Sequence, residues 1–282
     1  MPKIKLPHRV KQNENDIALL WDENQRIRRR IENVWGQVAD RVPYGHLLYA
    51  QAAFLALPGL RGFWPMSVFD SSGNAQDVSG HGHHLTYNGD PKYGHDGLLP
   101  YIDLDGTGDY LSIADDADFD ISGSESYVDN PGLTVGCLFN ASATASSYAL
   151  IAKYGAEGNR SFALYAAGSV RLYISDDGTN VDSVATAYGF LADQWYLAIA
   201  RFDDSDTGSE LKAWINGVPN TAATSRNSIY DSTADFTVGA VAGGSDLFPG
   251  NISLAFVCAY ALPDDTIDGL YDILNPVLYD MV

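Results

Sequence analysis

The stretch that decides the fold is YIDLDGTGDYLSIAD, residues 101–115, in which two short runs of alternating side chains flank a glycine turn. In the first run Ile102 and Leu104 fall on one face, and Asp103 and Asp105 fall on the other. A period of two residues is typical of a strand with one buried face. We therefore expect short strands joined by tight turns.

Similar runs continue as far as residue 262 and include LTVGCLFNA (133–141), SFALY (161–165), QWYLAIARFD (194–203) and NISLAFVCAYAL (251–262). Asn216-Gly217 is the strongest short signal for a hairpin turn. Trp195 alternates with Leu197 and Ile199, so we expect its ring in the core. Many short strands with no long helix between them predict a mainly β protein built as a sandwich of two sheets.

The N-terminal residues have a different pattern, because residues 13–41 read as a helix with apolar side chains at alternating spacings of three and four. Such a heptad seam predicts self-association, and a polar residue within it fixes register and oligomeric state. The alternative is an amphipathic helix packed on its own domain. The seam consists of Ile17, Leu20, Asn24, Ile27, Ile31, Val34 and Val38.

A second helix is predicted over residues 43–60, with Pro43 in its first turn and Pro58-Gly59 at its end. It is apolar on most sides, so we expect it to be buried. We divide the chain into a helical oligomerisation and docking arm at 1–61 and a β-sandwich at 62–282.

Charge is distributed unevenly along the chain, whose net charge is −19. Residues 1–61 hold 10 basic and 6 acidic side chains, a net of +4, and residues 62–282 hold 7 basic and 30 acidic ones, a net of −23. This excludes nucleic acid as a partner of the acidic part. We expect Arg28, Arg29 and Arg30 to dock on an acidic surface; interhelical ion pairs or a solvated face are the alternatives.

No apolar run approaches 18 residues, so no membrane-spanning helix is expected. The first residues, MPKIKLPHRVKQNEND, lack the apolar segment of an ordinary secretory signal.

The second part of the chain resembles the laminin-G-like, or concanavalin-A-like, jelly-roll domains. DVSGHGHHLTYNG, from Asp77, is similar to their D-x-S-G-x-G-x-x-G opening, and the order of the later motifs is the same over about residues 62–274. DQWYLAIARFD resembles their x-x-W-H-x-V-A-x-T-Y-D strand, with Tyr196 in place of the usual His. In the closing segment, Asp264 or Asp265 would cap a short helix.

The resemblance implies a curved sandwich of 12–14 strands that binds glycans, proteins or calcium, or forms part of a larger assembly. The enzymes among its relatives use two Glu a few residues apart on one strand. Here Glu125, Glu157 and Glu210 are each more than 30 residues apart. We therefore expect no catalytic residues and no enzymatic activity.

Metal sites are weighed separately. His81, His83 and His84 in SGHGHH suggest a metal, but loop histidines without nearby carboxylates are more often ordinary loop residues. Asp-rich turns suit calcium, with Asp105 and Asp109 as candidates. Ser161 stands where calcium-binding laminin-G domains place a ligand Asp. We therefore expect no cofactor, with calcium as the alternative.

Cys137 and Cys258 are expected to be buried free thiols, and a disulfide requires that their strands be adjacent.

Two functions follow from this reading. The first is a structural or attachment subunit of a larger assembly, such as a bacteriophage virion protein, which forms a homo-oligomer through its arm. We expect it in the virion, and the alternatives are the cytoplasm or export without a signal peptide. The second is a carbohydrate-binding or adhesion module whose exposed aromatic rings stack on sugars. A glycan-active enzyme is a third, weaker alternative.

Overall fold

The computed structural model describes residues 44–97, 99–121, 132–204 and 210–279. It divides the chain into two compact units, Met1–Tyr49 and Ala50–Val282. The first described element is helix α2 (Tyr44–Leu55), and the domain boundary expected between residues 61 and 62 lies inside the second unit. The helix expected over 13–41, with its seam and its three arginines, lies outside the described residues.

The first sheet contains eight of the described strands, all paired antiparallel. Their spatial order is β13 (Val218–Ala223), β12 (Glu210–Ile215), β11 (Trp195–Asp203), β6 (Gly132–Ala141), β15 (Pro249–Cys258), β4 (Leu99–Asp105) and β3 (Lys92–Asp96), and β1 (Leu60–Trp64) also pairs with β15.

The second sheet contains seven described strands, also antiparallel. Their order is β10 (Asp182–Gly189), β9 (Ser169–Ile174), β8 (Arg160–Ala166), β7 (Tyr148–Tyr154), β14 (Phe236–Val238), β5 (Tyr110–Ile113) and β2 (Thr86–Asn88). The short 3-10 helix η1 (Ala117–Phe119) follows β5. The described residues thus form a two-sheet sandwich, as predicted, with 15 strands where the resemblance implied 12–14.

The core lies between the two sheets and takes alternate side chains from their strands. On β4, Ile102 and Leu104 are buried and Asp103 and Asp105 are exposed, as the alternation predicted. These two apolar side chains belong to one cluster with Phe162 and others from the second sheet. Burial of this continuous apolar layer is the main stabilising term of the fold.

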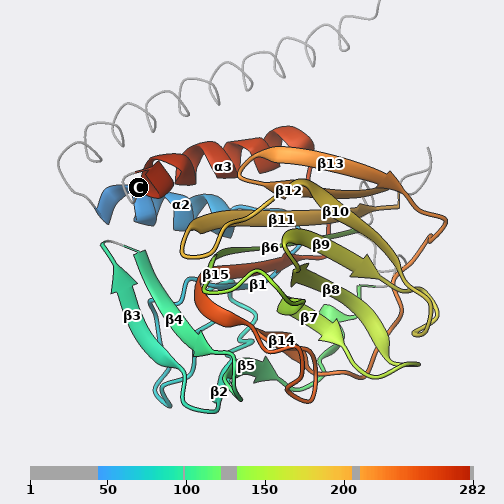
Figure 1. The fold of residues 1–282 in the computed structure, drawn as a ribbon, viewed down its shortest axis with the longest axis horizontal. Helices are drawn as coiled ribbons and strands as arrows, with labels where there is room; N and C mark the ends of the chain where they lie inside the picture. The colour runs from blue at the N-terminus through green and yellow to red at the C-terminus, as the bar shows by residue number, and fades with distance from the viewer. Residues whose placement is uncertain (1–43, 98, 122–131, 205–209, 280–282) are drawn as a thin grey trace, which may run out of the picture. The chain divides into compact units, whose positions relative to one another are not determined.

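Helix α3 (Asp264–Tyr279) follows β15 and lies beside β11, β12 and β13 (Figure 1). Asp264 is its first residue. Its carboxylate accepts hydrogen bonds from Arg201 of β11, at 2.8 Å, and from Lys212 of β12. These ion pairs fasten the start of α3 to the first sheet.

The outer face of the first sheet is buried where α3 covers it. Ala198, on β11, belongs to the cluster between the sheets, whereas Trp195, Leu197 and Ile199 point the other way and are also buried. Trp195 is therefore buried, as expected, but on the outer face and not between the sheets. The alternation of side chains assigns them to two faces of β11. It cannot say which face lies between the sheets, because both faces are buried.

Helix α2 is buried through Ala50 and Phe54, in agreement with the expectation that this apolar segment packs against another part of the protein. The ring of Phe54 stacks at 5.1 Å from that of Phe63 on β1 and packs 5.0 Å from Phe256 on β15. Leu55, on another face, is 48% exposed. The helix ends at Leu55, earlier than the predicted end at Pro58-Gly59, and residue 60 already begins β1.

The two cysteines lie on adjacent strands, but out of register. Cys137 on β6 faces Ala255, and Cys258 on β15 faces Thr134. Both are buried free thiols, as expected, and burial raises the pKa of each.

In the described part of the chain, no helix combines the length and the apolar character needed to span a membrane.

Candidate functional site

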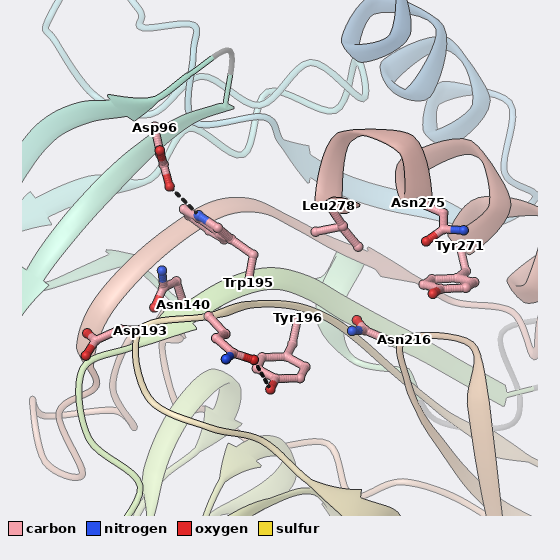
Figure 2. Close-up of a pocket in the computed structure, with 10 residues that line it drawn as sticks. Asp96, Asn140, Asp193, Trp195, Tyr196, Asn216, Tyr271, Asn275 and Leu278 are labelled. Atoms are coloured by element: carbon pink, nitrogen blue, oxygen red, sulfur yellow. Dashed lines mark hydrogen bonds between the residues drawn. The ribbon is translucent and has the colours of Figure 1, made fainter. Parts of the chain in front are cut away.

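A pocket of about 400 Å³ lies between the last turns of α3 and one end of the first sheet (Figure 2). We call it the aromatic pocket. It combines three ring side chains with amides and carboxylates, a mixture that suits a polar ligand with apolar faces. Its lining residues are Asp96, Asn140, Asp193, Gln194, Trp195, Tyr196, Asn216, Tyr271, Asn275 and Leu278.

Trp195 holds one wall of the aromatic pocket in place. Its Nε1 donates a hydrogen bond of 3.0 Å to Oδ2 of Asp96, at the end of β3, as Figure 2 shows. Its ring also packs at 6.0 Å from that of Tyr101 on β4. The hydrogen bond and the ring contact fix the orientation of the indole, which is 8% exposed.

Tyr196 comes from the same strand but faces the inside of the sandwich. Its ring packs against Phe139 and Phe190, and its hydroxyl donates a 3.0 Å hydrogen bond to Gln194 Oε1 (Figure 2). The same hydroxyl accepts from the backbone N–H of Leu191 at 3.1 Å. The position that relatives fill with His therefore carries a ring that anchors the loop before β11.

The turn Asn216-Gly217 forms the floor next to α3. Both residues have positive φ, 46° and 75°, as a type I′ hairpin turn requires and as the dipeptide predicted. Asn216 Oδ1 accepts from the backbone N–H of Leu197 at 2.9 Å, which ties the turn to β11. A Cβ on Gly217 would stand 2.6 Å from the ring of Tyr271, so glycine also allows α3 to approach.

Asn275 supplies the polar group that the protein itself does not satisfy. Its Oδ1 is buried and has no hydrogen-bond partner among the described residues. Asp193, on the opposite side, adopts a positive φ of 60° and so brings a carboxylate to the pocket from a strained turn. An acceptor that is buried without a partner costs free energy unless a ligand or water donates to it.

The histidine loop, residues 77–84 between β1 and β2, is built around the carboxylate of Asp77. Its Oδ1 accepts from the backbone N–H groups of Phe63 and Ser79 at 3.0 and 2.9 Å, and its Oδ2 accepts from those of Gly82 and His83 at 3.0 and 3.1 Å. Burial opposes ionisation of Asp77, but these hydrogen bonds outweigh it and hold its pKa below the usual range.

The structure brings two of the three loop histidines to carboxylates from η1, which the sequence did not anticipate. His83 Nε2 lies 3.6 Å from Asp116 Oδ1 and 3.4 Å from Asp118 Oδ2, and His81 Nδ1 lies 3.0 Å from the same oxygen of Asp118. His84 is directed elsewhere, since its Nδ1 accepts from the backbone N–H of Asp77.

The calcium candidates Asp105 and Asp109 already serve backbone groups. Asp105 Oδ1 accepts from the N–H of Thr107 at 2.6 Å, and Asp109 Oδ1 accepts from that of Asp90 at 2.7 Å. They do not fall in the group of potential metal ligands found among the described residues. A calcium site there stays a prediction, and the geometry shows two carboxylates that hold turns.

The described glutamates lie in different sheets. Glu210 begins β12 and pairs with Arg201 at 2.9 Å, and Glu157 is exposed in the turn between β7 and β8. Glu125 lies outside the described residues, as do the oligomerisation seam from Ile17 to Val38 and the docking residues Arg28–Arg30.

Sequence reasoning did not find the aromatic pocket, because its residues come from five separate segments. Trp195 and Asn216 were singled out for structural reasons only. The available signal for the rest was the amphipathic helix that begins at Asp264, whose last turns carry Tyr271 and Asn275. Nothing in the sequence says which sheet edge that helix covers.

Several solved structures share this architecture. The binding domain of botulinum neurotoxin serotype G has a TM-score of 0.59 at 12% identity, with 76% of this chain and 51% of that chain covered. The serotype D ligand binding domain in complex with N-acetylneuraminic acid has a TM-score of 0.58 at 13% identity, with coverage of 78% and 52%. The binding domain of Paraclostridial Mosquitocidal Protein 1 gives 0.57 at 12%, with 76% and 52%.

This chain therefore spans about half the length of those structures, and at such identity the likeness is one of fold. No curated protein sequence matches it. The model of the concanavalin A-like lectin/glucanases superfamily matches residues 105–268, which is more than half of the chain. The chain belongs to the concanavalin A-like lectin and glucanase superfamily.

Proposed function

We propose that the chain is a carbohydrate-binding module without catalytic activity, and that its ligand binds in the aromatic pocket. This was the second of the two functions that the sequence suggested. Its support is the superfamily, the likeness to toxin binding domains, and the composition of the pocket. A shared fold does not give a function, so the chemistry of the pocket has to carry the proposal.

The observation that carries it is the buried Oδ1 of Asn275, which has no hydrogen-bond partner in the described part of the chain and lies beside aromatic rings. A sugar ring has an apolar face of C–H groups and an edge of hydroxyls that donate and accept. The rings of Trp195 and Tyr271 offer apolar surface to the C–H face of the sugar, and the amides of the pocket can exchange hydrogen bonds with its hydroxyls. A sugar hydroxyl that donates to Asn275 would satisfy the orphan acceptor.

The charge of the pocket favours a neutral sugar. Its ten lining residues include Asp96 and Asp193 and no Lys or Arg. The residues from 62 onward carry a net charge of −23. A carboxylated sugar such as N-acetylneuraminic acid, which is present in one of the similar structures, would meet like charge here.

The absence of enzymatic activity is supported by what the described glutamates do. Glu210 is held by Arg201, and Glu157 is exposed on the other sheet, so they do not form the pair of facing carboxyl groups that glycoside hydrolysis uses.

The test begins with the full chain on a glycan array, followed by calorimetry with the best ligand. Neutral glycans should bind and their sialylated counterparts should not. Asn275→Ala should weaken binding about tenfold, the effect of one lost hydrogen bond of about 1.4 kcal/mol. Alanine is a better helix former than asparagine, so this variant should keep α3 intact.

Asp272→Ala, at an exposed position of the same helix outside the pocket, is the matched control and should bind normally. If no glycan binds, or if Asn275→Ala binds as well as the wild type, the aromatic pocket is not a sugar site.

The role of assembly subunit, including the virion location and the homo-oligomer, stays a prediction from residues outside the described part of the chain. It is compatible with glycan binding, because an assembly subunit can also present a binding module.

A further inference from the structure

The histidine loop and η1 place three potential metal ligands together on one side of the sandwich. They are His83 Nε2, Asp116 and Asp118, whose ligand atoms all lie within 4.8 Å of one another. His83 comes from the loop between β1 and β2. Asp116 is the N-cap of η1, and Asp118 lies within η1. The cluster does not include any residue that lines the aromatic pocket.

The tautomer of His83 is set by its second nitrogen. Nδ1 lies 2.8 Å from the backbone carbonyl oxygen of Arg61, and a carbonyl only accepts, so Nδ1 carries the proton. Nε2 then faces two carboxylates, which brings two like charges close together. Its distances of 3.4 and 3.6 Å exceed those of ordinary N–H···O hydrogen bonds. The imidazole is 6% exposed, so water has little access to relieve this contact.

A cation between the three groups would relieve it. In a tetrahedral zinc site with bonds of about 2.1 Å, neighbouring ligand atoms stand about 3.4 Å apart. The two measured separations match that spacing. A ring nitrogen with carboxylate oxygens suits Zn²⁺, whereas calcium takes oxygen ligands.

The surroundings hold the ligands in the required orientation. The backbone N–H of His83 is bound by Asp77, and its ring packs 4.6 Å from that of Phe119 in η1. His81 Nδ1, 3.0 Å from Asp118 Oδ2, stands where an outer-shell partner of a ligating carboxylate would stand. A ligating histidine whose other N–H is held by a backbone carbonyl is the usual arrangement in metal sites.

One positive group competes for the same carboxylate. Arg61 Nη1 lies 3.6 Å from Asp118 Oδ1, the oxygen that faces away from His83. It leaves Asp118 Oδ2 and Asp116 for the cation, and Asp116 Oδ1 also accepts the backbone N–H of Asp118 at 2.9 Å as the N-cap of η1. The side chains of Asp116 and Asp118 are 47% and 36% exposed, so the ion can enter from solvent and retain a water ligand.

We propose that His83, Asp116 and Asp118 bind a zinc ion that fastens the histidine loop to η1. This inference is independent of the proposed glycan site. It also reverses the sequence-based expectation for SGHGHH, because the carboxylates that the loop lacked are supplied by η1.

The experiment uses the full chain, stripped with a chelator and then titrated with Zn²⁺ against a fluorescent zinc chelator. We expect one zinc per chain by elemental mass spectrometry and a higher melting temperature with zinc, because an ion that binds only the folded state stabilises it. His83→Ala should abolish both effects. His81→Ala should weaken binding about 10- to 100-fold, as is typical of outer-shell partners.

His95→Ala, on the exposed strand β3, is the control and should bind zinc normally. Asp116→Asn tests the site with an isosteric change at an exposed side chain, so a folding defect cannot account for its loss of zinc. Two outcomes would overturn the proposal. One is a wild type that takes up no zinc. The other is a folded Asp116→Asn variant with wild-type zinc affinity.

Discussion

At the scale of single residues, Trp195 shows how one side chain serves both stability and the site. Its ring is buried on the outer face of β11, and its Nε1 reaches Asp96 on β3, 99 residues away in the sequence. We expect Trp195→Ala to lower the free energy of unfolding by about 3–5 kcal/mol, the usual cost of emptying a large aromatic position. Urea unfolding followed by circular dichroism measures it.

Trp195→Phe separates the contribution of the buried ring from that of the hydrogen bond to Asp96. Phenylalanine keeps most of the apolar volume and loses only the hydrogen bond to Asp96, which lies at an exposed position where water can replace the indole N–H. We therefore expect Trp195→Phe to lower the free energy of unfolding by about 1 kcal/mol. If Trp195→Ala unfolds at the wild-type urea concentration, the ring does not stabilise the fold.

The sequence predicted that Trp195 is buried and could not predict on which side. A period of two assigns Trp195, Leu197 and Ile199 to one face of β11 and Ala198 to the other, and both faces are apolar because α3 covers the outer one. The role of Asn275 was harder to predict from the sequence than the burial of Trp195. Its position in a helix follows from the pattern, but whether its amide is buried depends on contacts between distant segments.

At the scale of elements, the histidine loop depends on a single carboxylate. Asp77 accepts four backbone N–H groups, so Asp77→Asn would turn an NH₂ toward donors and leave some of them unsatisfied. We expect Asp77→Asn to lower the free energy of unfolding by about 1–3 kcal/mol at pH 7. Because the loop presents His83, the same variant should also bind zinc less tightly.

The effect of Asp77 should depend on pH in a defined direction. The folded-state pKa is lowered, so the stability that Asp77 contributes is present above the unfolded pKa and is lost as the pH falls through the folded value. The difference in free energy of unfolding between the wild type and Asp77→Asn should therefore become smaller below about pH 4. Asp103→Asn, at an exposed strand position, is the control. A difference that stays constant from pH 7 to pH 3 would contradict this role.

The elements also show where sequence reasoning ends. The turn at Asn216-Gly217 and the strands around Ile102 were predictable because local backbone geometry and alternation determine them. The meeting of His83 with Asp118 was not, because 35 positions separate them and only the packing of η1 beside the histidine loop brings them together. Contacts of this kind need the three-dimensional fold.

At the scale of the whole molecule, glycan binding and self-association would reinforce each other. A single pocket of about 400 Å³ can engage only a small part of a polysaccharide. If several chains are joined, the second binding event becomes intramolecular, and overall affinity for a surface can rise about 10²–10⁴-fold. The heptad pattern at residues 17–38 is the feature of the sequence that predicts such joining.

The last prediction tests that link in the full chain. Ile27→Asp with Ile31→Asp places charges on two seam positions, where burial of a carboxylate is costly, and should reduce the mass measured by light scattering to that of one chain, 30.5 kDa. Ala18→Asp with Gln25→Asp adds the same charge off the seam and should leave the wild-type mass. The seam variant should keep the affinity of a single site for a soluble glycan and lose the enhanced binding to a glycan-coated surface. A seam variant with the wild-type mass would show that association does not depend on the heptad.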